Sequence, residues 1–137
     1  MGTALQHNFK EFLKLLNVPG VEYLLVDGIA VGYHGYPRVT NDLDIWAAAN
    51  QANAEQIVKA LKEFEFDAPE LSVGLFQQEK LLVKMGTPPL RIEILMAVSG
   101  LKFSECYTAR VTDQLDGIEV SVVSLEHLKV KKSRRQV

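Results

Sequence analysis

Two carboxylates separated by a single residue form the most informative pattern in this sequence. Residues 42–46 read Asp-Leu-Asp-Ile-Trp. Side chains alternate between faces on a β-strand, so Asp42 and Asp44 would point one way while Leu43 and Ile45 point the other. Aspartate is depleted in strands, and two like charges repel, so a cation normally holds such a pair. A hard divalent metal with oxygen ligands fits this chemistry, and the alternative is the exposed face of an edge strand.

A third acid occurs in a second strand-like segment further along the chain. Residues 90–95 read Leu-Arg-Ile-Glu-Ile-Leu, so the two isoleucines face one way while Arg91 and Glu93 face the other. If this strand lies beside the aspartate strand, Glu93 joins the aspartates on one face. Three converging carboxylates would bind Mg²⁺ and, with it, the phosphates of a substrate. The alternative is a surface strand whose charged side chains simply face water.

Length and composition indicate an ordinary globular protein with an uneven charge distribution. The 137 residues suit one domain, 1–137, and 47% hydrophobic with 23% charged residues are typical values. Five of the 15 basic residues lie in the last nine positions, which contain no acid, and all 17 acids precede them. The acidic body argues against a large nucleic-acid interface, whereas the basic tail leaves a small one open.

Cysteine usage and hydropathy indicate a cytoplasmic protein. Cys106 is the only cysteine, so no intrachain disulfide can form, and a reducing compartment fits. The first ten residues contain no apolar core of a signal peptide, and no stretch reaches the roughly 18 apolar residues of a membrane span. We therefore expect neither a signal peptide nor contact with a membrane.

Periodicity and turn signals predict eleven elements in the order α-β-α-β-α-β-β-α-β-β-α. Asn50 and Ser124 are expected to cap helices, and Asp116-Gly117 is the strongest hairpin signal. This order predicts an α+β domain with a mixed β-sheet and helices packed mainly on one face. The predicted helices cover residues 5–16, 28–36, a segment from 51 to about 64, 101–109 and a segment from 125, and the predicted strands cover 22–26, 42–47, 80–85, 90–97, 110–115 and 118–123.

One longer pattern resembles a known family. Val26-Asp27-Gly28, a spacer at 29–41, and Asp42-Leu-Asp-Ile resemble the apolar-Gly-Gly/Ser and Asp-apolar-Asp motifs of the polymerase-β-like nucleotidyltransferase superfamily. The stretch from Gly28 to Trp46 is similar to its small bacterial branch, which includes minimal nucleotidyltransferases and toxin components of toxin–antitoxin and abortive-infection systems. Residues 124–132 are similar to the start of that branch's last helix.

The resemblance implies a nucleotidyltransferase-like fold and a Mg²⁺- or Mn²⁺-dependent reaction. In that family a hydroxyl attacks the α-phosphorus of a nucleoside triphosphate and expels pyrophosphate. The implied acceptor is a hydroxyl of a protein or RNA, and the branch also implies a partner protein encoded by an adjacent gene. By position, the implied catalytic metal ligands are Asp42, Asp44 and Glu93. The implied nucleotide-binding residues are Gly28, Arg38, Thr40 and Lys132. His34 is either a hydrogen-bond donor near the site or a half-buried helix residue.

The chain departs from the family pattern at one residue that matters for chemistry. Asp27 occupies the position of the first family glycine, where its charge would repel a triphosphate and its side chain would fill space that glycine leaves open. The Arg/Lys-Asp-Asp segment that usually follows the family's last helix also does not occur before Val137. These departures favour an alternative, a catalytically degenerate binding module that acts as a toxin–antitoxin-type partner.

Overall fold

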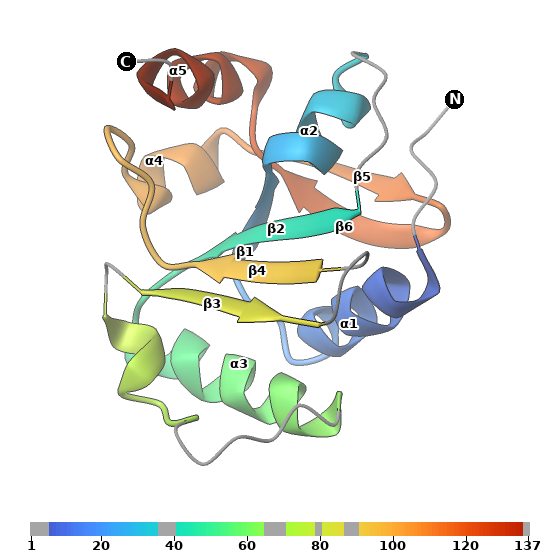
Figure 1. Ribbon diagram of the computed structural model, residues 1–137, viewed down its shortest axis with the longest axis vertical. Coiled ribbons are helices and arrows are strands. Elements are labelled where there is room, and N and C mark those ends of the chain that lie inside the picture. The colour runs from blue at the N-terminus through green and yellow to red at the C-terminus, as the bar shows by residue number, and fades with distance from the viewer. Residues whose placement is uncertain (1–5, 36–40, 65–70, 79–80, 87–90, 136–137) are drawn as a thin grey trace.

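Six strands and five α-helices make up the described part of the chain (Figure 1). A computed structural model describes residues 6–35, 41–64, 71–78, 81–86 and 91–135, with side chains as far as residue 130. The element order matches the predicted one, with a short 3₁₀ turn added before β3. The elements are α1 (His7–Asn17), β1 (Tyr23–Val26), α2 (Asp27–Tyr33), β2 (Asp42–Ala47), α3 (Gln51–Glu63), η1 (Leu75–Gln77), β3 (Leu82–Met85), β4 (Arg91–Leu95), α4 (Phe103–Thr108), β5 (Val111–Leu115), β6 (Ile118–Val122) and α5 (Leu125–Arg135).

The strands form one mixed sheet in the order β3-β4-β2-β1-β6-β5. β2 pairs with β4 and β1 pairs with β6 in parallel, while the other three pairings are antiparallel. Helix α3 belongs to the crossover that brings the chain from β2 back to its parallel neighbour β4, as parallel pairing requires. The predicted α+β fold with a mixed sheet is therefore confirmed.

The helices divide between the two faces of the sheet, so the prediction that they pack mainly on one face is wrong (Figure 1). Helices α1 and α3 contact each other on one side, where Phe12 of α1 meets Phe64 at a ring-centroid distance of 5.1 Å. On the other side, Phe103 of α4 packs edge-on against Trp46 of β2 at 5.3 Å. Trp46 is 2% exposed, as expected of a core residue. Burial of these aromatic and aliphatic side chains is the main stabilising term of the fold.

Local signals in the sequence place the ends of several elements. The Asn50 side-chain oxygen accepts a hydrogen bond from the Asn53 backbone N–H at 2.9 Å, and the Ser124 hydroxyl accepts one from the His127 N–H at 3.2 Å. Both are the N-cap contacts that the sequence predicts. Asp116 and Gly117 have φ angles of 52° and 82°, the positive values that a type I′ hairpin turn needs at both central positions.

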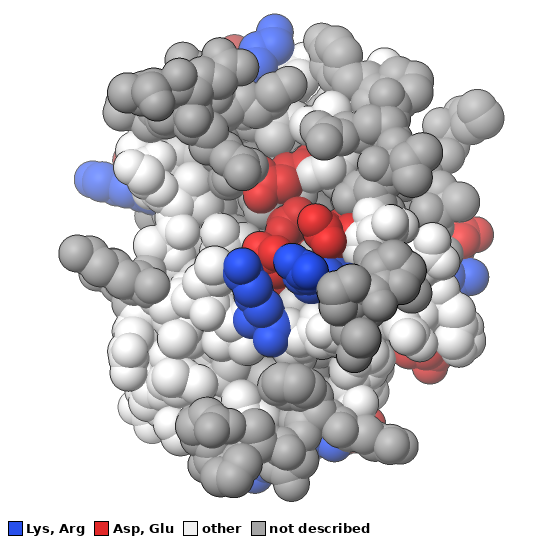
Figure 2. All heavy atoms as spheres, viewed as in Figure 1, with Lys and Arg blue, Asp and Glu red and all other residues white. Residues whose placement is uncertain are grey.

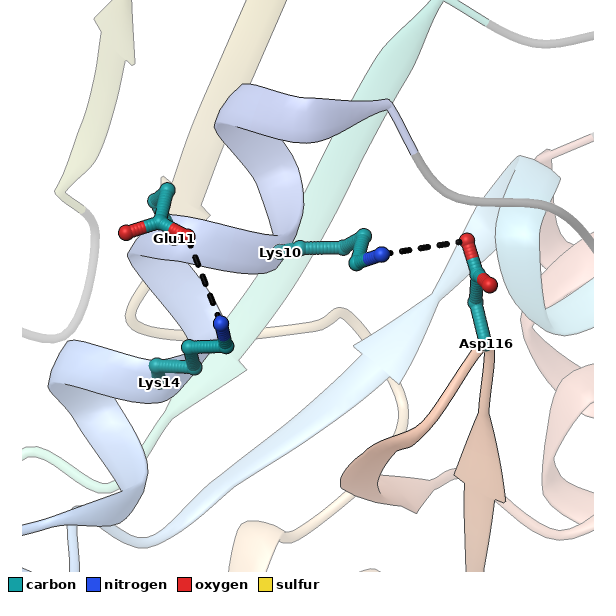
Figure 3. Close-up of polar contacts among 4 residues, drawn as sticks. All are labelled: Lys10, Glu11, Lys14 and Asp116. Atoms are coloured by element: carbon teal, nitrogen blue, oxygen red, sulfur yellow. Dashed lines mark hydrogen bonds and ion pairs between the residues drawn. The ribbon is translucent and has the colours of Figure 1, made fainter.

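Ion pairs add little to this framework. Lys10 of α1 lies 3.6 Å from Asp116 at the β5–β6 turn, and Lys14 lies 3.4 Å from Glu11 within α1 (Figure 3). All four side chains are partly exposed, so each pair is worth less than about 1 kcal/mol.

None of the helices in the described part of the chain has both the length and the apolar composition of a membrane span.

Candidate active site

The two aspartates of β2 lie on the sheet face opposite the one that β2 turns toward α1 and α3. Leu43 and Ile45 are 0% and 1% exposed, while Asp42 is half-buried. Asp44 is only 8% exposed, an unusual burial for a carboxylate. A charged group in such a place is costly unless other charges or hydrogen bonds compensate for it. The strand therefore presents two carboxylates, one of them buried, toward the same side.

Strand β4 brings a third carboxylate beside them. β4 is parallel to β2, with Asp42 opposite Arg91 and Asp44 opposite Glu93. Partners in register on neighbouring strands point to the same face, and the strands lie about 4.8 Å apart. The burial pattern of β4 agrees, because Ile92 is buried whereas Arg91 and Glu93 are half-buried. The expected arrangement of the two strands is thus confirmed, whereas the role of these acids remains a prediction.

Two basic residues complete the same face. Lys84 of β3 lies opposite Glu93 in the antiparallel β3–β4 pair, so one row across the sheet reads Asp44, Glu93, Lys84. Arg91 occupies the neighbouring row, next to Asp42. Figure 2 shows acidic side chains gathered near the centre of the visible face with basic side chains directly beside them. This juxtaposition suits a ligand that carries both a cation and phosphate groups, because each charge has an opposite charge within reach.

Asp27 lies at the end of β1, next to this face. Val26, the residue before Asp27, pairs with Asp44 across the sheet, and Asp27 is the first residue of α2. Its φ angle is 57°, in the left-handed region that glycine adopts without steric cost. Aspartate and asparagine enter this region more readily than other L-residues do. The backbone therefore keeps the conformation expected of a glycine although the chain carries an acid there.

The donor set fits a divalent cation in chemistry and in backbone position. Asp44 and Glu93 are adjacent across two strands, and Asp42 is two residues from Asp44, or about 7 Å along the strand. Carboxylates at these spacings can turn toward a common point. In the side-chain conformations present, however, no group of three or more His, Cys, Asp and Glu residues among those described is placed to hold one metal ion. Binding of one cation through all three carboxylates would therefore need a change of rotamer at these acids.

Helix α2 is fixed beside the site by two polar contacts at its end. Nε2 of His34 lies 2.8 Å from the Val123 carbonyl oxygen, which only accepts, so this nitrogen carries the proton. The Tyr33 hydroxyl donates to the Asp113 carboxylate at 2.7 Å. This bond raises the pKa of Tyr33 and, together with the Gln114 backbone N–H, lowers the pKa of Asp113. His34 is thus a half-buried residue that holds α2 against the end of β6.

The remaining predicted nucleotide-binding residues are only partly accounted for. Gly28 is the second residue of α2 and is half-buried beside Asp27. Arg38 and Thr40 lie outside the described residues. Lys132 belongs to α5, whose side chains are described only to residue 130. The structure therefore brings Gly28 to the site and leaves the other three as predictions.

Comparison with known proteins identifies the fold. No family model matches the sequence, and no curated protein matches it. Among solved structures, a crystal structure of a "putative nucleotidyltransferase" from Thermotoga maritima superposes with a TM-score of 0.62. The match covers 93% of this chain and 84% of the other, at 16% sequence identity. The chain has a nucleotidyltransferase-like fold. At this identity the likeness concerns the fold alone, and the activity has to be argued from the residues.

Lys84 is the feature of this face that sequence reasoning missed. Arg91 could be placed there because it alternates with Ile92 and shares a face with Glu93. Lys84 reaches the face through the register of β3 on β4, and that register depends on the connection between the strands. The segment 82–85 reads Leu-Val-Lys-Met, whose alternation alone does not say which residue of the partner strand Lys84 meets.

Proposed function

We propose that this protein is a Mg²⁺- or Mn²⁺-dependent nucleotidyltransferase that transfers a nucleoside monophosphate from an NTP to a hydroxyl of a protein or RNA. The observation that carries the proposal is the pairing of Asp44 with Glu93 in register, with Asp42 on the same face. The nucleotidyltransferase-like fold supports it. A cytoplasmic location, where NTPs and Mg²⁺ are available, belongs to the same proposal.

The roles of the residues follow from their chemistry and position. Asp42, Asp44 and Glu93 would hold the divalent cations, which when bound neutralise phosphate charge and lower the pKa of a coordinated hydroxyl. Arg91 and Lys84, in register with two of these acids, are positioned to attract the phosphates of the NTP. The acceptor oxygen forms a new bond to the α-phosphorus while the bond to pyrophosphate breaks. The hydroxyl proton passes to a site carboxylate or to water.

One observation favours a second function. Asp27 adds a negative charge beside Asp44 at the position where the resembling family has glycine. It would repel a triphosphate, and the acids in their present conformations do not gather around one point. We therefore keep as the alternative a degenerate nucleotidyltransferase-like module that binds a partner protein, of the toxin–antitoxin type, without turnover. The partner would be encoded by an adjacent gene.

A labelling experiment separates the two functions. The protein is incubated with each α-³²P-labelled NTP, Mg²⁺ or Mn²⁺, and either total RNA or the co-expressed product of the adjacent gene. Transfer of label with release of pyrophosphate supports the enzyme, and it should be lost in Asp44→Asn and in Glu93→Gln. Glu55→Gln is the matched control, because Glu55 is an exposed acid on α3, on the other side of the sheet. Stable binding of the adjacent-gene product with no label transferred under any condition would support the alternative instead.

A further inference from the structure

A second polar hollow lies at the start of β1, whereas the acidic face, which carries Asp42, Asp44 and Glu93, lies near the end of that strand. It has a volume of about 180 Å³ and is bordered by the end of α1, the start of β1, the α4–β5 connection and β6. Tyr23, at its wall, pairs with Ala47, whereas the buried Asp44 pairs with Val26. The two places are therefore three residues, or about 10 Å, apart along β1. The residues that matter for its chemistry are Asn17, Tyr23, Arg110, Thr112, Glu119 and Ser121.

Arg110 supplies a positive charge to this hollow. Its guanidinium carbon lies 3.8 Å from the centre of the Tyr107 ring, and one terminal N–H donates to the Tyr107 carbonyl at 2.8 Å. Its Nε–H is buried and has no hydrogen-bond partner among the described residues. A buried donor left without a partner costs about 1–3 kcal/mol. A planar carboxylate that engages this guanidinium after a small rotation of the side chain would recover part of that cost.

Glu119 supplies a negative charge to the same hollow. It lies two residues before Ser121 on β6, so both side chains share a face, and Thr112 of β5 lies directly opposite Ser121. No ion pair within 4 Å joins Glu119 to Arg110, and both residues lie wholly in the described part of the chain. Two opposite charges thus border one hollow without neutralising each other. Thr112 and Ser121 add hydroxyl groups to the same lining.

The remaining polar groups of the wall are already paired and give the hollow a fixed shape. The Tyr23 hydroxyl donates to the Asn17 side-chain oxygen at 3.0 Å, and the Asn17 amide donates to the Glu119 carbonyl at 2.8 Å. Burial raises the pKa of the Tyr23 hydroxyl, with a further contribution from the charge of Glu119, so this group stays neutral. The wall is therefore preorganised, and the charged groups of Arg110 and Glu119 can engage a ligand without rearranging it.

We infer that this hollow binds a small zwitterion of amino-acid size. Its carboxylate would pair with Arg110, its ammonium group with Glu119, and the Thr112 and Ser121 hydroxyls would bind between them. The volume is below the roughly 300–1,000 Å³ of sites for drug-sized ligands, which limits the occupant to a free amino acid or a similar molecule. This site is separate from the acidic face and would bind its ligand whether or not nucleotidyl transfer occurs.

The inference is tested by titrating ¹⁵N-labelled full-length protein with each of the common amino acids, and with acetate, methylammonium and inorganic phosphate. At least one amino acid should cause saturable shifts of the Thr112, Glu119 and Ser121 amides, while the single-charge probes bind much more weakly. Glu119→Gln and Arg110→Lys should each weaken binding about tenfold or more, because each removes one charged or bidentate contact. Asp44→Asn is the control and should bind as the wild type does.

Two results would overturn the inference. The first is the absence of saturable shifts with every amino acid at millimolar concentration. The second is binding of acetate or phosphate as tight as that of the amino acids and unchanged by Glu119→Gln, which would make the hollow a simple anion site. Glu119 is exposed, so its variant is expected to fold normally even if a change at Arg110 disturbs the end of α4. The titration uses no NTP and Asp44 does not line the hollow, so failure of this inference leaves the proposed nucleotidyl transfer untouched, and the reverse also holds.

Discussion

Asp27 offers the sharpest test of how the acidic face works, because backbone strain and charge meet in one residue. Its φ of 57° costs an L-residue roughly 1–2 kcal/mol, less for aspartate, and glycine pays none of this. Glycine in turn gains about 0.5–1 kcal/mol of entropy in the unfolded chain. The free energy of unfolding of Asp27→Gly should therefore equal that of the wild type or exceed it by up to about 1 kcal/mol.

The effect on nucleotide binding should be larger than the effect on stability. Asp27 follows Val26, the residue that pairs with Asp44. If Asp44 holds a nucleotide through a cation, the phosphates of that nucleotide lie within several ångströms of the Asp27 carboxylate. At separations of about 4–8 Å, one charge pair costs about 2–4 kcal/mol at an effective dielectric near 20. Salt in an open cleft reduces this value. About 1.4 kcal/mol corresponds to tenfold in affinity, so Asp27→Gly should bind Mg²⁺-ATP or Mg²⁺-GTP at least about tenfold more tightly.

Three variants separate charge from bulk. Asp27→Asn removes the charge but keeps the size and the tolerance for positive φ, so it should recover part of the gain in affinity at unchanged stability. Asp27→Ala also removes the charge but tolerates φ of 57° poorly, so it should be less stable than Asp27→Asn. Calorimetric titration gives the affinities and urea unfolding gives the stabilities. If Asp27→Gly folds as stably as expected yet binds neither nucleotide better than the wild type, the repulsion argument is refuted.

Three further perturbations test other parts of the structure. Mg²⁺ or Mn²⁺ should raise the melting temperature of the wild type but not of the Asp44→Asn, Glu93→Gln double variant, whose metal-free form should be more stable because carboxylate repulsion is gone; a metal-independent wild type would contradict this. Asn53→Ala should lower the free energy of unfolding in urea by about 2–4 kcal/mol, because a buried side chain loses its hydrogen bonds to the Glu22 and Ala48 backbone. Tyr33→Phe should flatten the pH dependence of stability measured by urea unfolding. Asp113, whose pKa is lowered in the fold, loses its contribution as pH falls through that pKa, and Tyr33, whose pKa is raised, loses its own as alkaline pH rises through its folded pKa.

Much of the fold was predictable because it follows from local chemistry. Alternation in residues 42–47 fixed both the bounds of β2 and the face of its aspartates. The Asp116-Gly117 turn and the Asn50 and Ser124 caps are side-chain and backbone preferences that act within a few residues. Glu93 could be assigned to the acidic face only on the assumption that its strand lies beside β2. That adjacency is a tertiary fact, and the parallel crossover through α3 supplies it.

Asn53 shows what local patterns cannot reveal. It is 6% exposed, its side-chain oxygen accepts from the Glu22 N–H at 2.7 Å, and its amide donates to the carbonyls of Glu22 at 3.0 Å and Ala48 at 2.9 Å. Helical periodicity treats an asparagine as a solvent-facing residue, and Glu22 lies 31 positions away. The bonds join the first turn of α3 to the segment that enters β1 and to the end of β2. A residue that holds the sheet together therefore looks like an ordinary helix-surface position.

The acidic face is a place where function and stability oppose each other. Asp44 is buried and lies beside Glu93, and Val26, its partner on β1, is followed by Asp27. These like charges lie close together on a sheet that would be more stable with apolar side chains at the same positions. Lys84 and Arg91, in register with Glu93 and Asp42, reduce this repulsion. A cation–phosphate ligand would relieve both sets of charges together, because the acids take the cation and the basic residues take the phosphates. The repulsion among the acids would then appear as affinity for that ligand, while the charge of Asp27 opposes the approach of its phosphates.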